Sequence, residues 1–200
     1  MGKIKFAIFD VGQVCYPFSL KPLNDFCMLN TSDKCDFNNK KGISSFDYKP
    51  FMLGKINFKE FCEDLCRHCN IGYSDDLIVK IDEKLHQGVG EFFEETIKVM
   101  AHLKERNVVC CLLSNALPNL ADTAKNLVAY DKVFVSYKLG LLKPDIRIYE
   151  KVLKILRAVP EEVIFIDDKI GNVEAAKSIG INGIVFSREN IANDIKRLVK

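Results

Sequence analysis

The sequence predicts an α/β fold: a doubly wound parallel sheet with a small helical cap inserted after the first strand. From about residue 90 onward, apolar runs of strand length alternate with amphipathic segments of helix length. That alternation is typical of parallel sheets joined by crossover helices. Between residues 16 and 90 no such apolar run occurs, and apolar residues recur at helical spacing. We therefore expect a core domain of residues 1–15 and 91–200, with a helical cap of residues 16–90.

Composition supports a globular protein and excludes several classes of partner. The 200 residues are 48% hydrophobic and 28% charged, enough to bury a substantial core. A formal net charge of +2, from 29 basic and 27 acidic residues, gives no electrostatic reason to expect nucleic acid or an anionic membrane. No signal-peptide apolar region opens the chain, and no run approaches a membrane helix in length. A small anion bound locally is compatible with this charge balance. We expect a cytoplasmic protein that is a monomer or a homodimer, although the sequence leaves the oligomeric state open.

The first strand ends at a carboxylate. Residues 6–9, FAIF, contain no polar member, so they read as a strand buried on both faces of a sheet. Asp10 follows directly, and open α/β sheets bind their ligands at the carboxyl ends of their strands. Asp10 is therefore the first candidate for chemistry. The alternative is that Asp10 and Gly12 merely begin a turn, where both residue types are common.

The remaining elements follow from periodicity and helix-end signals. In the cap, Phe58, Phe61 and Leu65 recur at helical steps over 58–69, with Asn57 as the expected N-cap. A second cap helix is expected over 74–86, capped by Ser74, and short helices and loops over 30–51. In the core we expect helices at 91–105, 117–127, 145–157, 172–179 and 190–200, and strands at 108–113, 132–136, 163–166 and 182–186.

The cysteines read as buried thiols. Cys15, Cys110 and Cys111 lie in or beside expected strands, which suits reduced cysteines acting as small hydrophobic residues. Cys62, Cys66 and Cys69 have a CxxxCxxC spacing that some iron–sulfur enzymes use. On a helix, however, these three positions share one face with Leu65. Packing in the core of the cap accounts for them.

Polar residues gather where the expected strands end. Ser114 and Asn115 follow the strand at 108–113, Asp167 and Asp168 follow the strand at 163–166, and Lys143 lies in the loop after the strand at 132–136. If these residues share one edge of the sheet with Asp10, they suit a phosphate held beside Mg²⁺. Carboxylates are the hard oxygen ligands that Mg²⁺ prefers, and serine with lysine stabilises phosphoryl oxygens. Asp10 can then act as the nucleophile that attacks phosphorus.

Four segments in order resemble the motifs of the haloacid dehalogenase (HAD) superfamily: FDVGQV, LLSNA, GLLKPD and VIFIDDKIGNVEAA. The segment between the first two resembles the small helical cap of the branch that contains dehalogenases and phosphatases, subfamily IA. Within that branch the motifs are most similar to bacterial α-D-glucose-1-phosphate phosphatases. The resemblance implies a Mg²⁺-dependent phosphatase that hydrolyses a small phosphorylated metabolite, such as a sugar phosphate, through an aspartyl-phosphate intermediate.

The resemblance also implies a role for each motif residue. Asp10 is expected to be the nucleophile and a Mg²⁺ ligand, and the Gly12 carbonyl and Asp168, with Asp167, are expected to complete the metal site. Ser114 and Asn115 are expected to bind the phosphoryl group. Lys143 is expected to neutralise the charges of Asp10 and the phosphate.

One position departs from the phosphatase pattern. Most phosphatases of the superfamily have a second aspartate two residues after the nucleophile, which protonates the leaving group, and this chain has Gly12 there. General acid catalysis is typically worth about 10² to 10⁴ in rate. Two alternatives follow: a 2-haloacid dehalogenase that uses Asp10 to displace halide, or a phosphate-binding protein with impaired turnover. Halide displacement needs no metal, whereas adjacent Asp167 and Asp168 beside Asp10 repel one another unless a cation lies among them.

Overall fold

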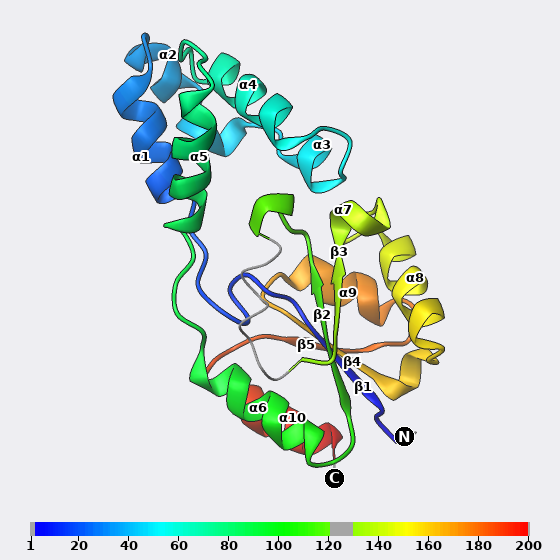
Figure 1. Cartoon of the computed structure of the whole chain (residues 1–200). Helices are drawn as coiled ribbons and strands as arrows, with labels where there is room; N and C mark the ends of the chain where they lie inside the picture. The colour runs from blue at the N-terminus through cyan, green and yellow to red at the C-terminus, as the bar shows by residue number, and fades with distance from the viewer. Residues whose placement is uncertain (1–2, 121–129, 200) are drawn as a thin grey trace.

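The computed structural model describes residues 3–120 and 130–199 and has the expected α/β architecture, a five-stranded parallel sheet with helices on both faces (Figure 1). The strand order is β3-β2-β1-β4-β5, so the first strand lies at the centre. The strands are β1 (Phe6–Phe9), β2 (Val109–Ser114), β3 (Lys132–Val135), β4 (Val163–Asp167) and β5 (Asn182–Val185). In the pairing register, Phe9 lies opposite Leu112 on one side and Ile166 on the other.

Helices cover the sheet, and a separate group of helices stands beyond it. The core helices are α6 (Glu94–Lys104), α7 (Ser136–Leu139), α8 (Ile146–Leu156), α9 (Ile170–Lys177) and α10 (Ile191–Leu198), with 3₁₀ turns η2 (Pro118–Leu120) and η4 (Pro160–Glu162). The other group is α1 (Lys21–Asn30), α2 (Lys34–Asn39), the 3₁₀ turn η1 (Gly42–Ser45), α3 (Lys49–Met52), α4 (Phe58–His68) and α5 (Asp76–His86). This second group stands together away from the sheet in Figure 1; we call it the cap.

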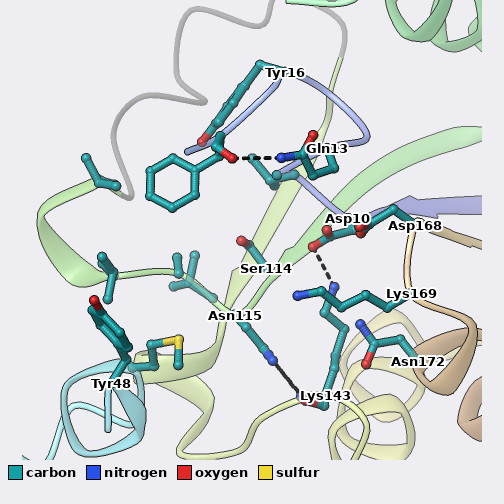
Figure 2. A pocket seen from close by; sticks show the side chains of 18 of the residues that line it. Asp10, Gln13, Tyr16, Tyr48, Ser114, Asn115, Lys143, Asp168, Lys169 and Asn172 are labelled. Atoms are coloured by element: carbon teal, nitrogen blue, oxygen red, sulfur yellow. Dashed lines mark hydrogen bonds and ion pairs between the residues drawn. The ribbon is translucent and has the colours of Figure 1, made fainter. Parts of the chain in front are cut away.

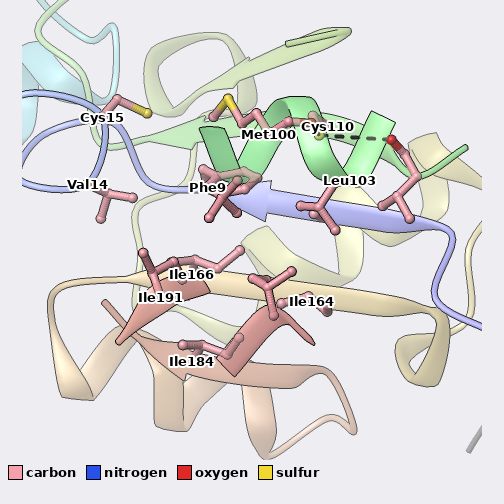
Figure 3. Close-up of a cluster of buried hydrophobic side chains, with 14 of the residues drawn as sticks. Phe9, Val14, Cys15, Met100, Leu103, Cys110, Ile164, Ile166, Ile184 and Ile191 are labelled. Carbon is pink, nitrogen blue, oxygen red and sulfur yellow. Dashed lines mark hydrogen bonds between the residues drawn. The ribbon is translucent and has the colours of Figure 1, made fainter. Parts of the chain in front are cut away.

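Two apolar layers enclose the sheet because alternate strand residues point to opposite faces. On one face, Phe9, Ile164 and Ile166 pack against α6 and α10 (Figure 3). On the other face, Ile8, Cys111 and Phe165 pack against α8 and α9. Both faces of β1 are therefore buried, as its unbroken apolar run predicts.

The cap has its own apolar core. Phe51, Phe61 and Leu65 are buried there, together with the thiols of α4. Helix α4 begins as predicted: the Asn57 side chain accepts the Glu60 N–H at 3.0 Å, and the Glu60 carboxylate accepts the Asn57 N–H at 2.7 Å. This reciprocal pair is a capping box, which satisfies two backbone donors at the start of the helix. The cysteines are free thiols, and Cys62, Cys66 and Cys69 pack in this core, as the helical-face interpretation predicted.

Three predicted helix starts are wrong. Helix α6 begins at Glu94, three residues after the predicted residue 91, with Phe93 at the N-cap position. Helix α5 begins at Asp76, with Asp75 rather than Ser74 at the N-cap position and no side-chain cap. The Asp75 carboxylate instead accepts the Tyr73 hydroxyl at 2.9 Å. Helix α9 begins at Ile170, two residues before the predicted Asn172, after the Lys169 N–H has bonded to the Asp167 carboxylate at 2.9 Å.

Two further segments differ from the prediction, and one of them lies partly outside the described residues. Helix α7 was not predicted: Ser136 was assigned to the end of a strand, but the chain turns into a short helix there that ends at left-handed Gly140 (φ 68°). The predicted helix over 117–127 is a 3₁₀ turn at Pro118–Leu120, and its remaining residues lie outside the described part of the chain.

Candidate active site

Asp10 lies at the carboxyl end of the central strand. Its N–H donates to the Ile166 carbonyl of β4 at 2.8 Å, which continues the sheet one residue beyond β1. The residue is 9% exposed, so a charged carboxylate is held almost out of water. Burial of a carboxylate is unfavourable unless a partner compensates for the lost hydration. The partner here is a lysine.

Lys143 stands at the centre of the site. Its ammonium donates to the Asp10 carboxylate at 2.6 Å, to the Asp167 carboxylate at 2.7 Å and to the Leu113 carbonyl at 2.9 Å. An ammonium has three donors, and all three are used. The lysine side chain is only 1% exposed. Two carboxylates from neighbouring strands are thus held together by one buried cation.

The two adjacent aspartates that follow β4 have different environments. Both Asp167 oxygens accept from the Asn172 amide at 2.9 Å, in addition to the Lys143 and Lys169 bonds, and Asp167 is fully buried. Asp168 is half-buried, and its buried Oδ1 has no hydrogen-bond partner in the described residues. The Asp167 carboxylate is therefore fully hydrogen-bonded within the protein. The Asp168 carboxylate, which lies beside Asp10, is not (Figure 2).

The electrostatics of the group follow from burial and crowding. Burial raises the pKa of Asp10, opposed by the nearby Lys143 charge and reinforced by Asp167. Burial also raises the pKa of Asp168, again with a contribution from Asp167. Burial alone lowers the pKa of Lys143, but Asp10 and Asp167 outweigh it, so the net shift is upward and the ammonium stays charged. The three carboxylates Asp10, Asp167 and Asp168 therefore carry more negative charge than the buried Lys143 ammonium compensates.

The two residues at the end of β2, Ser114 and Asn115, have different contacts. The Asn115 amide donates to the Lys143 carbonyl at 2.8 Å, and its oxygen accepts the Lys143 N–H at 2.9 Å. Each end of that side chain thus makes one hydrogen bond to the backbone of Lys143. Ser114, which ends β2, points into the cavity above Asp10 (Figure 2).

Sequence reasoning assigned no role to two residues that the site uses. Asn172 anchors Asp167, and its carbonyl accepts the buried Tyr149 hydroxyl of α8 at 2.9 Å. Lys169 is exposed and extends along the cavity wall toward Asp10 (Figure 2). The Asn172 position was part of the fourth quoted motif, and that signal was sufficient to single it out. No sequence signal distinguished Lys169 from an ordinary surface lysine.

Gly12 lines the cavity but is not required by the backbone. A Cβ atom at this position would lie 3.8 Å from the Phe18 Cβ, an ordinary van der Waals distance, and no left-handed conformation holds the residue. A Cβ atom therefore fits at position 12 without a close contact. The missing carboxylate is a chemical difference and not a consequence of space.

The arrangement of carboxylates fits a hard divalent cation. Ligand oxygens of Asp10, Asp167 and Asp168 all lie within 4.8 Å of one another, the one such metal-capable cluster in residues 3–120 and 130–199. Mg²⁺ takes oxygen ligands and is commonly held by one or two carboxylates. The unpartnered Asp168 oxygen and the saturated Asp167 indicate that Asp10 and Asp168 have ligand capacity to spare.

Comparison with known proteins identifies the family. A model of haloacid dehalogenase-like hydrolases matches residues 52–180. The sesquiterpene phosphatase astK of Aspergillus oryzae is 44% identical over 186 residues, which cover 90% of this chain and 88% of that protein. This chain belongs to the haloacid dehalogenase-like hydrolases. The predicted superfamily is confirmed, and the narrower likeness to glucose-1-phosphate phosphatases stays a prediction.

Other members of the family are similar over different lengths. The D-ribitol-5-phosphate phosphatase of Bacteroides thetaiotaomicron is 26% identical over 95% of this chain and 94% of its own length. Drimenol cyclase drtB of Aspergillus calidoustus is 34% identical over 71 residues, and the chain covers only 13% of that much longer protein.

Solved structures of the family share the fold. The HAD family enzyme bt-2542 of Bacteroides thetaiotaomicron, crystallised with magnesium and inorganic phosphate, superposes with a TM-score of 0.73 and 21% identity over 92% of this chain and 95% of that chain. The L-2-haloacid dehalogenase of Xanthobacter autotrophicus superposes with a TM-score of 0.62 and 17% identity over 97% of this chain and 83% of that chain. In the described part of this hydrolase no helix is long and apolar enough to span a membrane.

Proposed function

We propose that this hydrolase is a Mg²⁺-dependent phosphatase that cleaves a small phosphorylated metabolite through an aspartyl-phosphate on Asp10. The observation that carries the proposal is the split between the two motif aspartates. Asp167 is used up in anchoring Lys143 and Asn172. Asp168 instead has a buried oxygen without a hydrogen-bond partner in the described residues, and one of its carboxylate oxygens lies within 4.8 Å of a carboxylate oxygen of Asp10. A hydrolase that displaces halide has no use for a second carboxylate left open beside its nucleophile.

The proposed metal site consists of Asp10, Asp168 and the Gly12 carbonyl, with Asp167 as the residue that orients the others. Mg²⁺ bound there supplies positive charge to the phosphoryl oxygens. Lys143 fixes the Asp10 carboxylate and supplies further positive charge, and Ser114 is the proposed phosphoryl ligand from β2. We assign Asn115 to positioning, because its amide holds the Lys143 backbone from both sides.

The proposed chemistry consumes one water. An Asp10 oxygen attacks phosphorus, a new O–P bond forms and the ester P–O bond breaks. The departing alkoxide takes a proton from water, since Gly12 offers none, and leaves hydroxide. Water then attacks phosphorus, the bond from phosphorus to the Asp10 oxygen breaks, and inorganic phosphate is released as Asp10 is restored. The proton that this water loses neutralises the hydroxide. The net products are an alcohol and phosphate.

The remaining expectations stand as proposals of the same kind. We propose that residues 16–90 act as the cap that selects the leaving group, that the protein is cytoplasmic, and that it is a monomer or a homodimer. Two relatives are named for different alcohols on the phosphoryl group, a sesquiterpene in one and D-ribitol in the other. Either a polyol or sugar ester, or an apolar ester, is therefore compatible with the family.

Exchange of the nucleophile tests the proposed function. Asp10→Asn is expected to abolish hydrolysis of acetyl phosphate, because an amide is a poor nucleophile and a poor Mg²⁺ ligand. The fold, checked by circular dichroism, is expected to persist. Wild-type activity should disappear in EDTA and return with Mg²⁺. Mass spectrometry of acid-quenched wild-type enzyme should show one added phosphoryl group, absent from the variant.

The matched control is Asp25→Asn, which removes an exposed carboxylate of the cap and should leave turnover unchanged. Retained activity in Asp10→Asn would eliminate the covalent mechanism. Release of halide from 2-chloropropionate in EDTA would support the dehalogenase alternative instead.

A further inference from the structure

The cavity above Asp10 has two chemically different ends. Its volume is about 620 Å³, within the range of about 300–1,000 Å³ typical of small-molecule sites. The charged lining residues are Asp10, Lys143, Asp168 and Lys169, all at the carboxyl ends of strands or in the loops that follow them. Within the described residues, the cap contributes no charged side chain to the lining.

The other end of the cavity is apolar. Its walls come from four segments far apart in the sequence and include Phe18, Leu20, Met52, Leu117, Leu120 and Val133. Tyr48 stands with them, across the cavity from Asp10 and Asp168 (Figure 2). If a phosphoryl group is bound at the charged end, the rest of the ligand therefore extends toward these apolar side chains.

Three of the polar groups that line the cavity each make one hydrogen bond within the protein. The Tyr48 hydroxyl donates to the Ile43 carbonyl at 3.3 Å, and the Gln13 amide donates to the Phe18 carbonyl at 2.7 Å. The Ser19 hydroxyl accepts the Lys21 N–H at 3.1 Å. A sugar or polyol needs a partner for each hydroxyl that leaves water, because an unmade hydrogen bond is costly inside a protein. The apolar walls offer few partners to such a ligand.

We propose that the leaving group is the alcohol of a long apolar chain, so that the enzyme hydrolyses phosphate esters of alkyl or isoprenoid-type alcohols. This proposal rests on the proposed phosphatase function and specifies its substrate class. The apolar walls bind the chain by the hydrophobic effect, and the charged end holds the phosphoryl group. Specificity then arises from the exclusion of hydroxyl-rich leaving groups as much as from attraction of the chain.

A chain-length series tests the proposal directly. For n-alkyl phosphates, kcat/KM is expected to rise by up to about fourfold per added methylene until the cavity is filled, since each buried methylene contributes about 0.8 kcal/mol. Ribitol 5-phosphate and glucose 6-phosphate should be poor substrates. Farnesyl phosphate and farnesyl diphosphate, assayed side by side, distinguish a monoester from a diphosphate as the source of the phosphoryl group.

A second measurement needs no turnover. In the presence of Mg²⁺, n-alkyl phosphonates are not hydrolysed, and they should raise the melting temperature by an amount that grows with chain length. Acetyl phosphate reports the phosphatase reaction without an apolar chain. If acetyl phosphate is hydrolysed while both chain-length series are flat, or while ribitol 5-phosphate is preferred, the apolar substrate class is overturned and the phosphatase function stands. If nothing is hydrolysed but the phosphonate series rises, the phosphatase function fails and the apolar site stands.

Matched variants locate the effect. Met52→Gln and Val133→Thr place a polar group in the apolar wall at nearly unchanged volume, and each should lower the preference for decyl over acetyl phosphate several-fold. The controls are Met28→Gln, in the cap core away from the cavity, and Val185→Thr, on the opposite edge strand. Val133 and Val185 are similarly exposed, at 43% and 41%. An equal loss of preference in the control variants would contradict the assignment of the apolar wall.

Discussion

At the scale of single residues, the site depends on one lysine that bridges two carboxylates. Lys143 joins Asp10 of the β1 end to Asp167 of the β4 end, and Asn115 after β2 holds the lysine backbone. Three neighbouring strands are thus tied together where the chemistry is proposed to occur. The residue that differs from the superfamily pattern, Gly12, lies just outside this network and leaves it intact.

Gly12→Asp should restore a general acid near the leaving oxygen. Position 12 lines the cavity, and the nearest atom to a new Cβ is 3.8 Å away, so the Cβ itself meets no close contact. The gain in kcat/KM should approach about 10² to 10⁴ for alkyl phosphates, whose alkoxides are poor leaving groups, and should be small for acetyl phosphate. The measurement is a plot of log kcat/KM against leaving-group pKa for both proteins. Equal slopes would show that position 12 does not limit turnover.

Asp168→Asn separates metal binding from folding. Burial and the adjacent Asp167 raise the pKa of Asp168, so its charged form destabilises the metal-free protein. The amide removes that charge and is a poor Mg²⁺ ligand. We therefore expect a higher melting temperature than wild type in EDTA at neutral pH, no further rise with Mg²⁺, and no turnover. A Mg²⁺-dependent rise in the variant equal to that of wild type would exclude Asp168 as a ligand.

At the scale of elements, helix α4 of the cap is held at its start by the capping box of Asn57 and Glu60. Loss of an N-cap side chain typically costs about 0.5–2 kcal/mol. Asn57→Ala should therefore lower the free energy of unfolding by about 1 kcal/mol, measured by urea denaturation. The control is Asn190→Ala at the start of α10, where the asparagine makes no side-chain cap bond. Equal costs at both positions would show that the box contributes nothing specific.

The boundaries of elements show where local sequence signals suffice. Asn57 was predicted as a cap and is one, because Glu60 three residues later completes a reciprocal capping box with it. Ser74 was predicted as a cap and is not one: α5 has Asp75 at its N-cap position, and the Ser74 carbonyl accepts the Leu77 N–H at 3.0 Å in the turn that leads into the helix. Helix α7 escaped prediction because its four residues are too short for a helical period to register. Its Ser136 hydroxyl donates to the Met52 carbonyl at 2.7 Å and so ties the core to the cap.

At the scale of the whole molecule, stability without metal should depend on pH. Burial raises the folded-state pKa of Asp10 and Asp168 above the usual 3.8. A raised carboxyl pKa stabilises the fold at acid pH, and that contribution is lost as pH rises through the folded pKa. In EDTA, the melting temperature should therefore fall as pH rises above the usual carboxyl pKa of 3.8.

Saturating Mg²⁺ should remove that decline, because the ion compensates both carboxylates and binds only the folded protein. The pH dependence should also be weaker in Asp168→Asn. A metal-free melting temperature that rises over the same pH range in wild type and variant alike would contradict the charge distribution described for the site.

The sequence by itself determined the sheet and the position of the candidate nucleophile. Unbroken apolar runs mark strands buried on both faces, and the residue after each run must lie at the sheet edge, so the positions of Asp10, Ser114 and Asp167 followed from local pattern alone. The four motifs in order were enough to predict the superfamily, and comparison confirmed it. These signals are local, and a linear sequence displays them directly.

Only the tertiary structure decided how adjacent residues divide their roles. Asp167 and Asp168 are equivalent in the sequence, yet one is saturated by Lys143 and Asn172 while the other retains an unpartnered oxygen. The apolar wall of the cavity likewise combines residues from segments far apart along the chain, such as Met52 and Val133. The hydrogen bonds of a side chain and the lining of a cavity depend on contacts between residues far apart in the sequence. The spacing of residues within one segment does not specify those contacts.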